Sequence, residues 1–257
     1  MGADQSFDTS DDAVLGGRLR LRQPLRGHRV GHDAILLAAS TGARAGEHAV
    51  DLGAGVGGAG LALAVRVPGL NVTLVEIDAA LCALAAGNAE RNDLSERVNA
   101  IACDVEDARA LAAAGLVPGN IDRVLMNPPF NDARRQNVSP DARRRLAHVA
   151  DAGLLERWVA TASALLKPRG TLTLIWRADG LDEVLSVLSA AFGAVAVLPV
   201  YPRADAPAIR VLVRAVKGAT AAAPVTLSGL VLNDASGKPT DAAEAVLRHA
   251  APLALAE

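Results

Sequence analysis

Four consecutive residues, Asn127-Pro128-Pro129-Phe130, place an amide, two rigid imino acids and an aromatic ring directly after the apolar run 121–126. A residue that precedes proline is forced toward extended geometry, so Asn127 and Pro128 should both present their carbonyl groups outward. An exocyclic amino group could then donate to the Asn127 side-chain oxygen and the Pro128 carbonyl, while Phe130 stacks on a base. The motif predicts a site that methylates a planar amine. The alternative is a proline-stiffened strand end with a core phenylalanine.

A glycine-rich turn forms the second motif. Residues 51–58 read DLGAGVGG after a predicted strand, and residues 75–78 read VEID at the end of the next strand. Glycines let the backbone pass close to a ligand, and Glu76 could accept hydrogen bonds from ribose hydroxyls. The glycines at 53, 55 and 58 also match the dinucleotide fingerprint G-x-G-x-x-G. Glycine spacing alone therefore leaves NAD and S-adenosylmethionine open.

Two acidic residues favour S-adenosylmethionine. Asp51 precedes the turn, where its charge would repel a pyrophosphate but suits a cationic amino-acid tail. Asp104 follows the third strand and could meet an adenine amino group. The sulfonium methyl is already activated, so in-line transfer requires alignment more than a strong base.

A strand, turn and helix rhythm positions these motifs. Strands are expected at 48–52, 71–75, 98–101, 121–126, 171–176, 194–200 and 209–216, and helices at 57–66, 79–92, 151–166 and 181–191, with a turn at 166–170. The alternation predicts an α/β fold, a Rossmann-like, mostly parallel seven-stranded sheet with helices on both faces.

Additions are expected at both ends of this fold. Residues 1–14 are predicted to be a disordered leader. Residues 15–216 form the main domain, which begins with a short strand or hairpin. Residues 217–257 form a linker (217–224), a strand (225–232) and a helix (240–249) that extend the same domain.

The order and spacing of D-L-G-A-G, V-E-I-D and N-P-P-F resemble the amino-group methyltransferases of the Rossmann-like class, which act on adenine N6, guanine N2 or glutamine N5. The flanking segments resemble bacterial tRNA adenine-N6 methyltransferases that modify the valine tRNA anticodon loop. These segments are 12–21, Gln23-Pro24, 27–29, 33–38 and 229–232.

The resemblance implies roles for individual residues. The implied ligands of S-adenosyl-L-methionine are Asp51, Gly53, Ala54, Gly55, Glu76, Ile77, Asp104, Val105 and Asn127. Residues Asn127 to Phe130 would hold the target amine.

Arginines are the candidate contacts to a tRNA substrate. Arg18, Arg20 and Arg22 alternate with apolar residues, so they should share one face of a strand. Arg134 and Arg135 follow the Asn-Pro-Pro-Phe motif and could contact phosphates beside a flipped base.

Composition bounds the remaining possibilities. The net charge of −2 argues against a protein that coats nucleic acid. Two cysteines without metal-type spacing indicate no metal site and a reducing cytoplasm. No apolar run reaches ~20 residues, so no membrane span is expected. Other readings are a guanine N2 or protein glutamine methyltransferase, a non-catalytic RNA-binding protein on the same fold and, least favoured, an NAD-linked oxidoreductase.

Overall fold

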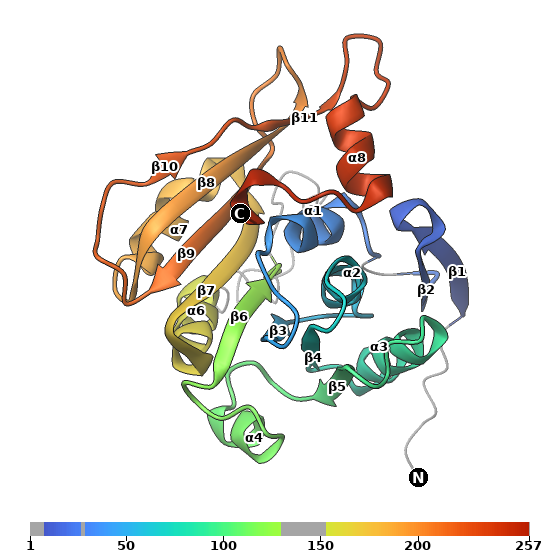
Figure 1. Cartoon of the computed structure of the whole chain (residues 1–257), viewed down its shortest axis with the longest axis vertical. Helices are drawn as coiled ribbons and strands as arrows, with labels where there is room; N and C mark the ends of the chain where they lie inside the picture. Colours follow the sequence, from blue (N-terminus) through green and yellow to red (C-terminus); the bar gives the residue numbers. More distant parts are fainter. Residues whose placement is uncertain (1–7, 27–28, 130–152, 257) are drawn as a thin grey trace, which may run out of the picture.

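The structure is a computed structural model that describes residues 8–26, 29–129 and 153–256. Its central sheet runs in the order β10-β8-β9-β7-β6-β3-β4-β5, and β11 pairs with β8 (Figure 1). The seven strands of the predicted sheet are β3 (His48–Leu52), β4 (Asn71–Glu76), β5 (Val98–Ala102), β6 (Ile121–Met126), β7 (Leu166–Arg177), β8 (Phe192–Arg203) and β9 (Arg210–Lys217). β3 to β7 pair in parallel, whereas β9 runs antiparallel to β7 and β8. The predicted α/β class and mostly parallel sheet are confirmed.

The helices cover both faces of the sheet, as predicted. In chain order they are α1 (His32–Ser40), α2 (Gly58–Arg66), α3 (Ala79–Arg91), α4 (Ala108–Ala113), α6 (Leu154–Leu165), α7 (Leu181–Leu188) and α8 (Asp241–His249). Buried apolar side chains of α1, α2, α3 and α8 join one cluster, and those of α4, α6 and α7 join another. On β6, Leu125 belongs to the first cluster and Val124 and Met126 to the second. A strand buried on both faces reads as a continuous apolar run, which is why the sequence located it.

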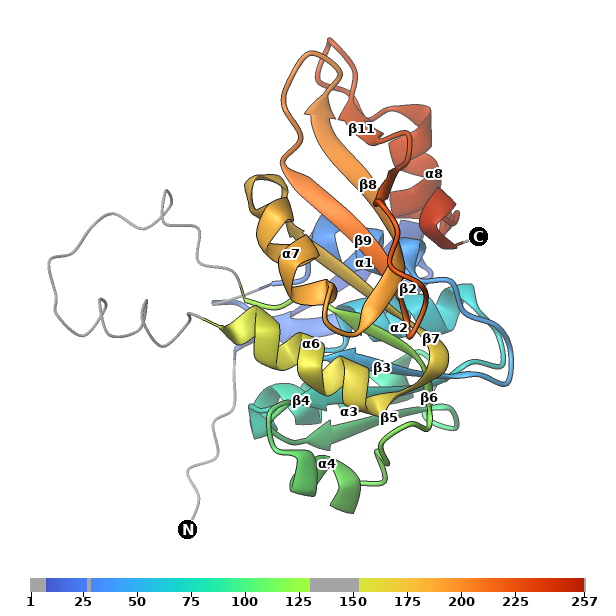
Figure 2. The ribbon, with the colours of Figure 1, turned by 90° about the vertical axis from the view of Figure 1, so that its left-hand side faces the viewer.

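Two C-terminal strands join the predicted seven, so that the sheet has nine strands in the described part of the chain. The strand expected at 225–232 is two short strands, β10 (Val225–Thr226) and β11 (Leu230–Asn233), and both pair in parallel with β8. α8 follows β11 and lies beside α1 (Figures 1 and 2).

The predicted leader is wrong for its last residues. Thr9–Val14 form strand β1, which pairs antiparallel with β2 (Leu19–Pro24). A short 3-10 helix at Leu15–Gly17 connects the two strands. The acidic residues of β1 are partnered: Asp12 Oδ2 accepts hydrogen bonds from Arg29 at 2.7 Å and Gln23 at 2.8 Å. Asp11 pairs with Arg20 and Arg91. A polar sequence that read as solvated is held by charge pairs.

One further expectation on local structure is wrong, and one helix was not expected. The turn predicted at 166–170 belongs to β7, which starts directly after α6. An irregularity in its pairing with β6, between Ile121 and Arg123, accommodates these residues. The sequence reading also missed α4, a six-residue helix whose N-terminus is capped by the Asp107 side chain. In the part of the chain that the structure describes, no helix is long and apolar enough to cross a membrane.

The packing of α2 on the sheet gives a testable contrast between two helical glycines. A Cβ at Gly60 of α2 would overlap Leu74 Cδ2 and lie 3.1 Å from Asp51 Oδ2, whereas a Cβ at Gly87 of α3 would meet nothing within 4 Å. Gly60→Ala should therefore lower the free energy of unfolding by about 1–3 kcal/mol. Gly87→Ala should raise it by up to about 1 kcal/mol, because alanine is the better helix former. Urea titration measures both, and equal stabilities would contradict this packing.

Candidate active site

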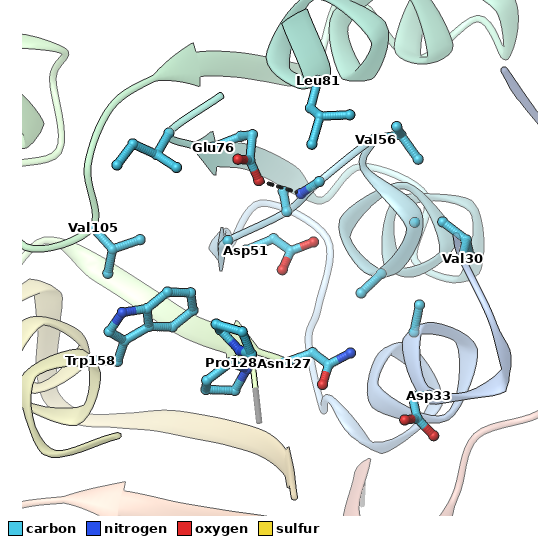
Figure 3. Close-up of a pocket in the computed structure, with 18 of the residues that line it drawn as sticks. Val30, Asp33, Asp51, Val56, Glu76, Leu81, Val105, Asn127, Pro128 and Trp158 are labelled. Atoms are coloured by element: carbon cyan, nitrogen blue, oxygen red, sulfur yellow. Dashed lines mark hydrogen bonds between the residues drawn. The ribbon is translucent and has the colours of Figure 1, made fainter. Parts of the chain in front are cut away.

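A pocket of about 860 Å³ lies at the carboxyl ends of β3, β4 and β6 (Figure 3). The chain runs from β3 to β4 on one side, whereas β6 pairs with β3 on the other, so the strand order reverses here. Open α/β sheets bind ligands at this switch point. The residues predicted to bind a cofactor all line the pocket: Asp51, Gly53, Ala54, Gly55, Glu76, Ile77, Asp104, Val105 and Asn127.

The glycine-rich turn after β3 forms one wall of this pocket. Gly53 and Gly55 adopt φ angles of +70° and +57°, which favour glycine. A Cβ at Gly53 would overlap the ring of Trp158, whereas a Cβ at Gly55 would meet no atom of the described residues within 4 Å. Gly53 therefore admits the indole, and the backbone at Gly55 is open to a ligand.

Glu76 anchors the turn to the next strand. Its Oε2 accepts the Gly55 N–H at 2.8 Å, as the dashed line in Figure 3 shows. Its Oε1 accepts the Asp78 N–H at 2.9 Å. A carboxylate has about four acceptor positions, so each oxygen keeps a lone pair for another donor. The same side chain can hold the turn and bind a hydroxyl in the pocket.

Asp51 is a buried carboxyl in the middle of the pocket wall. It is 2% exposed, and its Oδ2 accepts the Gly60 N–H at 2.8 Å. Burial raises the pKa of Asp51 to about 7, while the Gly60 N–H lowers it and the Glu76 carboxylate raises it further. A cation bound beside Asp51 would favour the ionised form.

Asn127 stands at the end of β6, opposite the glycine-rich turn. Its side chain is half-buried, and its buried Oδ1 has no hydrogen-bond partner among the described residues. An unsatisfied buried acceptor costs about 1–3 kcal/mol, which an incoming donor would remove. A half-turn about the Cβ–Cγ bond exchanges the two amide atoms, so the oxygen can also be turned to a donor in the pocket.

The structure places only part of the predicted acceptor and RNA residues. Pro128 and Pro129 line the pocket, the first buried and the second exposed. Phe130, Arg134 and Arg135 lie outside the described residues.

The N-terminal arginines are described. Arg20 and Arg22 are exposed on β2 and alternate with the buried Leu19 and Leu21, as predicted. Arg18 precedes the strand and donates to the His249 carbonyl at 3.3 Å. None of the three arginines lines the pocket, and their contact with RNA stays a prediction.

Trp158, Asp33 and Arg210 are among the pocket-lining residues that the sequence did not predict. Trp158 of α6 is 9% exposed; it belongs to a core cluster and also lines the pocket, beside Pro128 in Figure 3. Asp33 lies in the first turn of α1, after the cap position Gly31, and its Oδ2 accepts from Arg210 Nε at 2.9 Å. Both members of this pair line the pocket.

Arg210 could be found only from the topology. It opens β9, and because β9 runs antiparallel to its neighbours, its first residue lies at the carboxyl edge of the parallel strands. Within the described ranges, no group of three or more His, Cys, Asp or Glu residues could hold a metal ion.

The strand order, the switch-point pocket and the glycine turn define the class I methyltransferase fold. The family model "Methyltransferase small domain" matches residues 30–200, and the chain belongs to this family.

Two relatives and one solved structure show what the chain is similar to. The chain is 33% identical over 160 residues to tRNA1(Val) (adenine(37)-N6)-methyltransferase of Porphyromonas gingivalis, covering 61% of each chain. It is 32% identical over 162 residues to release factor glutamine methyltransferase of Chlorobaculum tepidum, covering 61% of this chain and 54% of that one. The crystal structure of a predicted O-methyltransferase from Agrobacterium tumefaciens is similar to this structure, with a TM-score of 0.72. The two chains are 30% identical, and the match covers 86% of this chain and 98% of that one. The chain thus matches less than two thirds of the first two relatives' length.

The buried Asp51 makes stability depend on pH in a stated direction. Its pKa is about 7 in the folded protein and 3.8 in the unfolded chain, so above pH 4 the unfolded chain loses this proton first. Asp51→Asn removes the titration and keeps an acceptor for the Gly60 N–H. The free energy of unfolding of the wild type, minus that of Asp51→Asn, should fall between pH 4 and pH 7 by at most about 1.4 kcal/mol per pH unit. Above pH 7 the difference should level off. Urea titrations across this range measure it, and parallel pH profiles would contradict the assignment.

Proposed function

We propose that the protein is an S-adenosylmethionine-dependent methyltransferase that transfers a methyl group to the exocyclic N6 amine of an adenosine in a tRNA anticodon loop. Residues 9–216, which include the hairpin of β1 and β2, would form the methyltransferase domain, and residues 217–257 its extension. The observation that carries the proposal is the buried Asn127 Oδ1, which has no hydrogen-bond partner in the described part of the chain, in a pocket lined by all the predicted cofactor ligands.

The side chains of the pocket suit the parts of S-adenosylmethionine. Asp51 offers a carboxylate to the cationic amino-acid tail, and Glu76 offers free lone pairs to the ribose hydroxyls. Asp104 is exposed, and the buried Val105 follows it, so a polar and an apolar contact stand together for an adenine ring. The cofactor supplies a methyl group on a positively charged sulfur.

The residues after β6 suit an amine acceptor. An amino group that donates one hydrogen to Asn127 Oδ1 and the other to the Pro128 carbonyl is fixed in orientation, with its lone pair free to attack the methyl carbon. The N–C bond would form as the S–C bond breaks, and the resulting cationic amine would release one proton to water. No strong base is required, because the acidity of that amine is high once it is methylated.

The acceptor rests on the relatives and on the flanking sequence. The Porphyromonas gingivalis relative is named for adenine N6 of a tRNA, and it matches as strongly as the glutamine methyltransferase. The N-terminal hairpin adds exposed Arg20 and Arg22, which suit phosphates. The second candidate is methylation of a protein glutamine, because its side-chain amide presents the same planar NH₂ group. A tRNA-modifying enzyme would act in the cytoplasm, which agrees with two buried free cysteines.

Asn127→Ala tests the acceptor site. Because the amide aligns the amine rather than the cofactor, turnover should fall by about 100-fold. The dissociation constant of S-adenosylmethionine, measured by calorimetry, should change by less than about fivefold, since Asn127 is one of many lining residues. Asn120→Ala is the matched control: Asn120 is exposed and precedes the other end of β6. Near-normal turnover of Asn127→Ala would contradict the site.

The product identifies the acceptor. Incubation of total tRNA with methyl-labelled S-adenosylmethionine, followed by digestion to nucleosides, should yield labelled N6-methyladenosine. N2-methylguanosine from RNA, or labelled N5-methylglutamine from protein, would replace the adenine assignment. Failure to bind the cofactor would instead favour a non-catalytic RNA-binding protein.

A further inference from the structure

The outer edge of the N-terminal hairpin is covered by a helix rather than by a strand. β1 pairs with one edge of β2, and the other edge faces α3. There, Asn92 Oδ1 accepts the Arg20 N–H at 2.8 Å and Asn92 Nδ2 donates to the Arg20 carbonyl at 2.8 Å. Asn88 repeats this pattern with the N–H and C=O of Arg22, at 2.7 and 3.0 Å. Two side-chain amides therefore take the place of a third strand.

The two asparagines can bond alternate residues of β2 because the spacing along the helix and the spacing along the strand are similar. Residues four apart on a helix rise about 6 Å, and residues two apart on a strand rise about 6.7 Å. The backbone also dictates how each amide is turned, since an N–H can only donate and a carbonyl can only accept. The pair Asn88 and Asn92 is thus a matched set of contacts between α3 and β2.

Asn88 differs from Asn92 in one contact. Its Nδ2 also donates to the Val56 carbonyl at 3.0 Å, and the side chain is fully buried. Val56 belongs to the glycine-rich turn and lines the pocket (Figure 3). Asn92, the residue directly after α3, instead donates to the Asn88 carbonyl, one turn earlier on the helix.

A second link runs from the hairpin to the pocket through Gln23. This side chain is 2% exposed; its Nε2 donates to Asp12 and its Oε1 accepts the Val30 N–H at 2.9 Å. Val30 also lines the pocket, and its Cγ2 would lie 2.6 Å from a Cβ at Gly58. The hairpin therefore supports the pocket wall at two points, Val56 and Val30.

We propose that Asn88 is a positioning residue that holds the glycine-rich turn at Val56 from the backbone of β2, so that the N-terminal hairpin is part of the cofactor site. Glu76 holds the same turn from the β4 side, through the Gly55 N–H. The turn would then be fixed from two sides. Only the statement about the cofactor rests on the proposed function.

The test compares Asn88→Ala with Asn92→Ala, which both remove two hydrogen bonds to β2 while only the first removes the bond to Val56. Amide hydrogen exchange is measured by NMR on the full chain without ligand. In the wild type the Gly55 N–H is bonded to Glu76 and the Gly57 N–H to the Ala54 carbonyl. Their exchange should accelerate about tenfold in Asn88→Ala and less than about twofold in Asn92→Ala. Equal rates in the two variants would overturn the proposal.

Calorimetry with S-adenosylmethionine gives the second readout. The dissociation constant should rise about tenfold in Asn88→Ala and stay within about twofold in Asn92→Ala. Equal affinities would overturn the proposal. A wild-type protein that does not bind S-adenosylmethionine would overturn the proposed function but not this inference, which the exchange rates test alone.

Asn88→Ala also leaves buried polar groups without partners, which by itself lowers the stability of the protein. A third test therefore uses the wild type alone. By linkage, a contact that couples β2 to the turn should make cofactor binding slow exchange of the Arg22 N–H, which Asn88 accepts. Unchanged exchange at Arg22 under saturating S-adenosylmethionine would overturn the proposal.

Discussion

The buried carboxyl of Asp51 constrains everything built around the first strand of the parallel core. A carboxyl that is 2% exposed must be satisfied by a donor, and the Gly60 N–H of α2 supplies it at 2.8 Å. That contact requires α2 to lie close to β3 and β4, which leaves no room for a side chain at position 60. The start of α2 in turn fixes where the glycine-rich turn must end. The contact between Asp51 and Gly60 thus fixes the position of α2, and with it the glycine-rich turn that forms one wall of the pocket.

Most of the site could be predicted because its residues are local in sequence. Asp51 is the next-to-last residue of β3, and Asn127 directly follows β6. Apolar strands are read directly from the sequence, so β3 and β6 were placed to the residue. Trp158 and Arg210 could not be placed in the same way. Their approach to the pocket depends on how α6 covers the sheet and on the reversed direction of β9, and neither fact leaves a periodic signal.

The wrong local predictions also have physical causes. Pro168 and Gly170 signal a turn, but both residues lie within β7, where its pairing with β6 is irregular. Asp11 and Asp12 read as solvated charges until their arginine partners, which are far apart in sequence, are brought beside them. Asparagines that bond a strand edge, such as Asn88, resemble ordinary helix residues in the sequence. Partners distant along the chain decide all three cases.

Trp158 gives the pocket an intrinsic optical reporter. The chain has two tryptophans, and Trp176, which is buried in β7, does not line the pocket. The indole of Trp158 lies against Gly53 and forms part of the pocket wall. Indole emission responds to the polarity and charge of its surroundings, so a sulfonium or an aromatic base that enters would change the emission of one known side chain. The contact that requires glycine at position 53 therefore also lets occupancy be followed without any label.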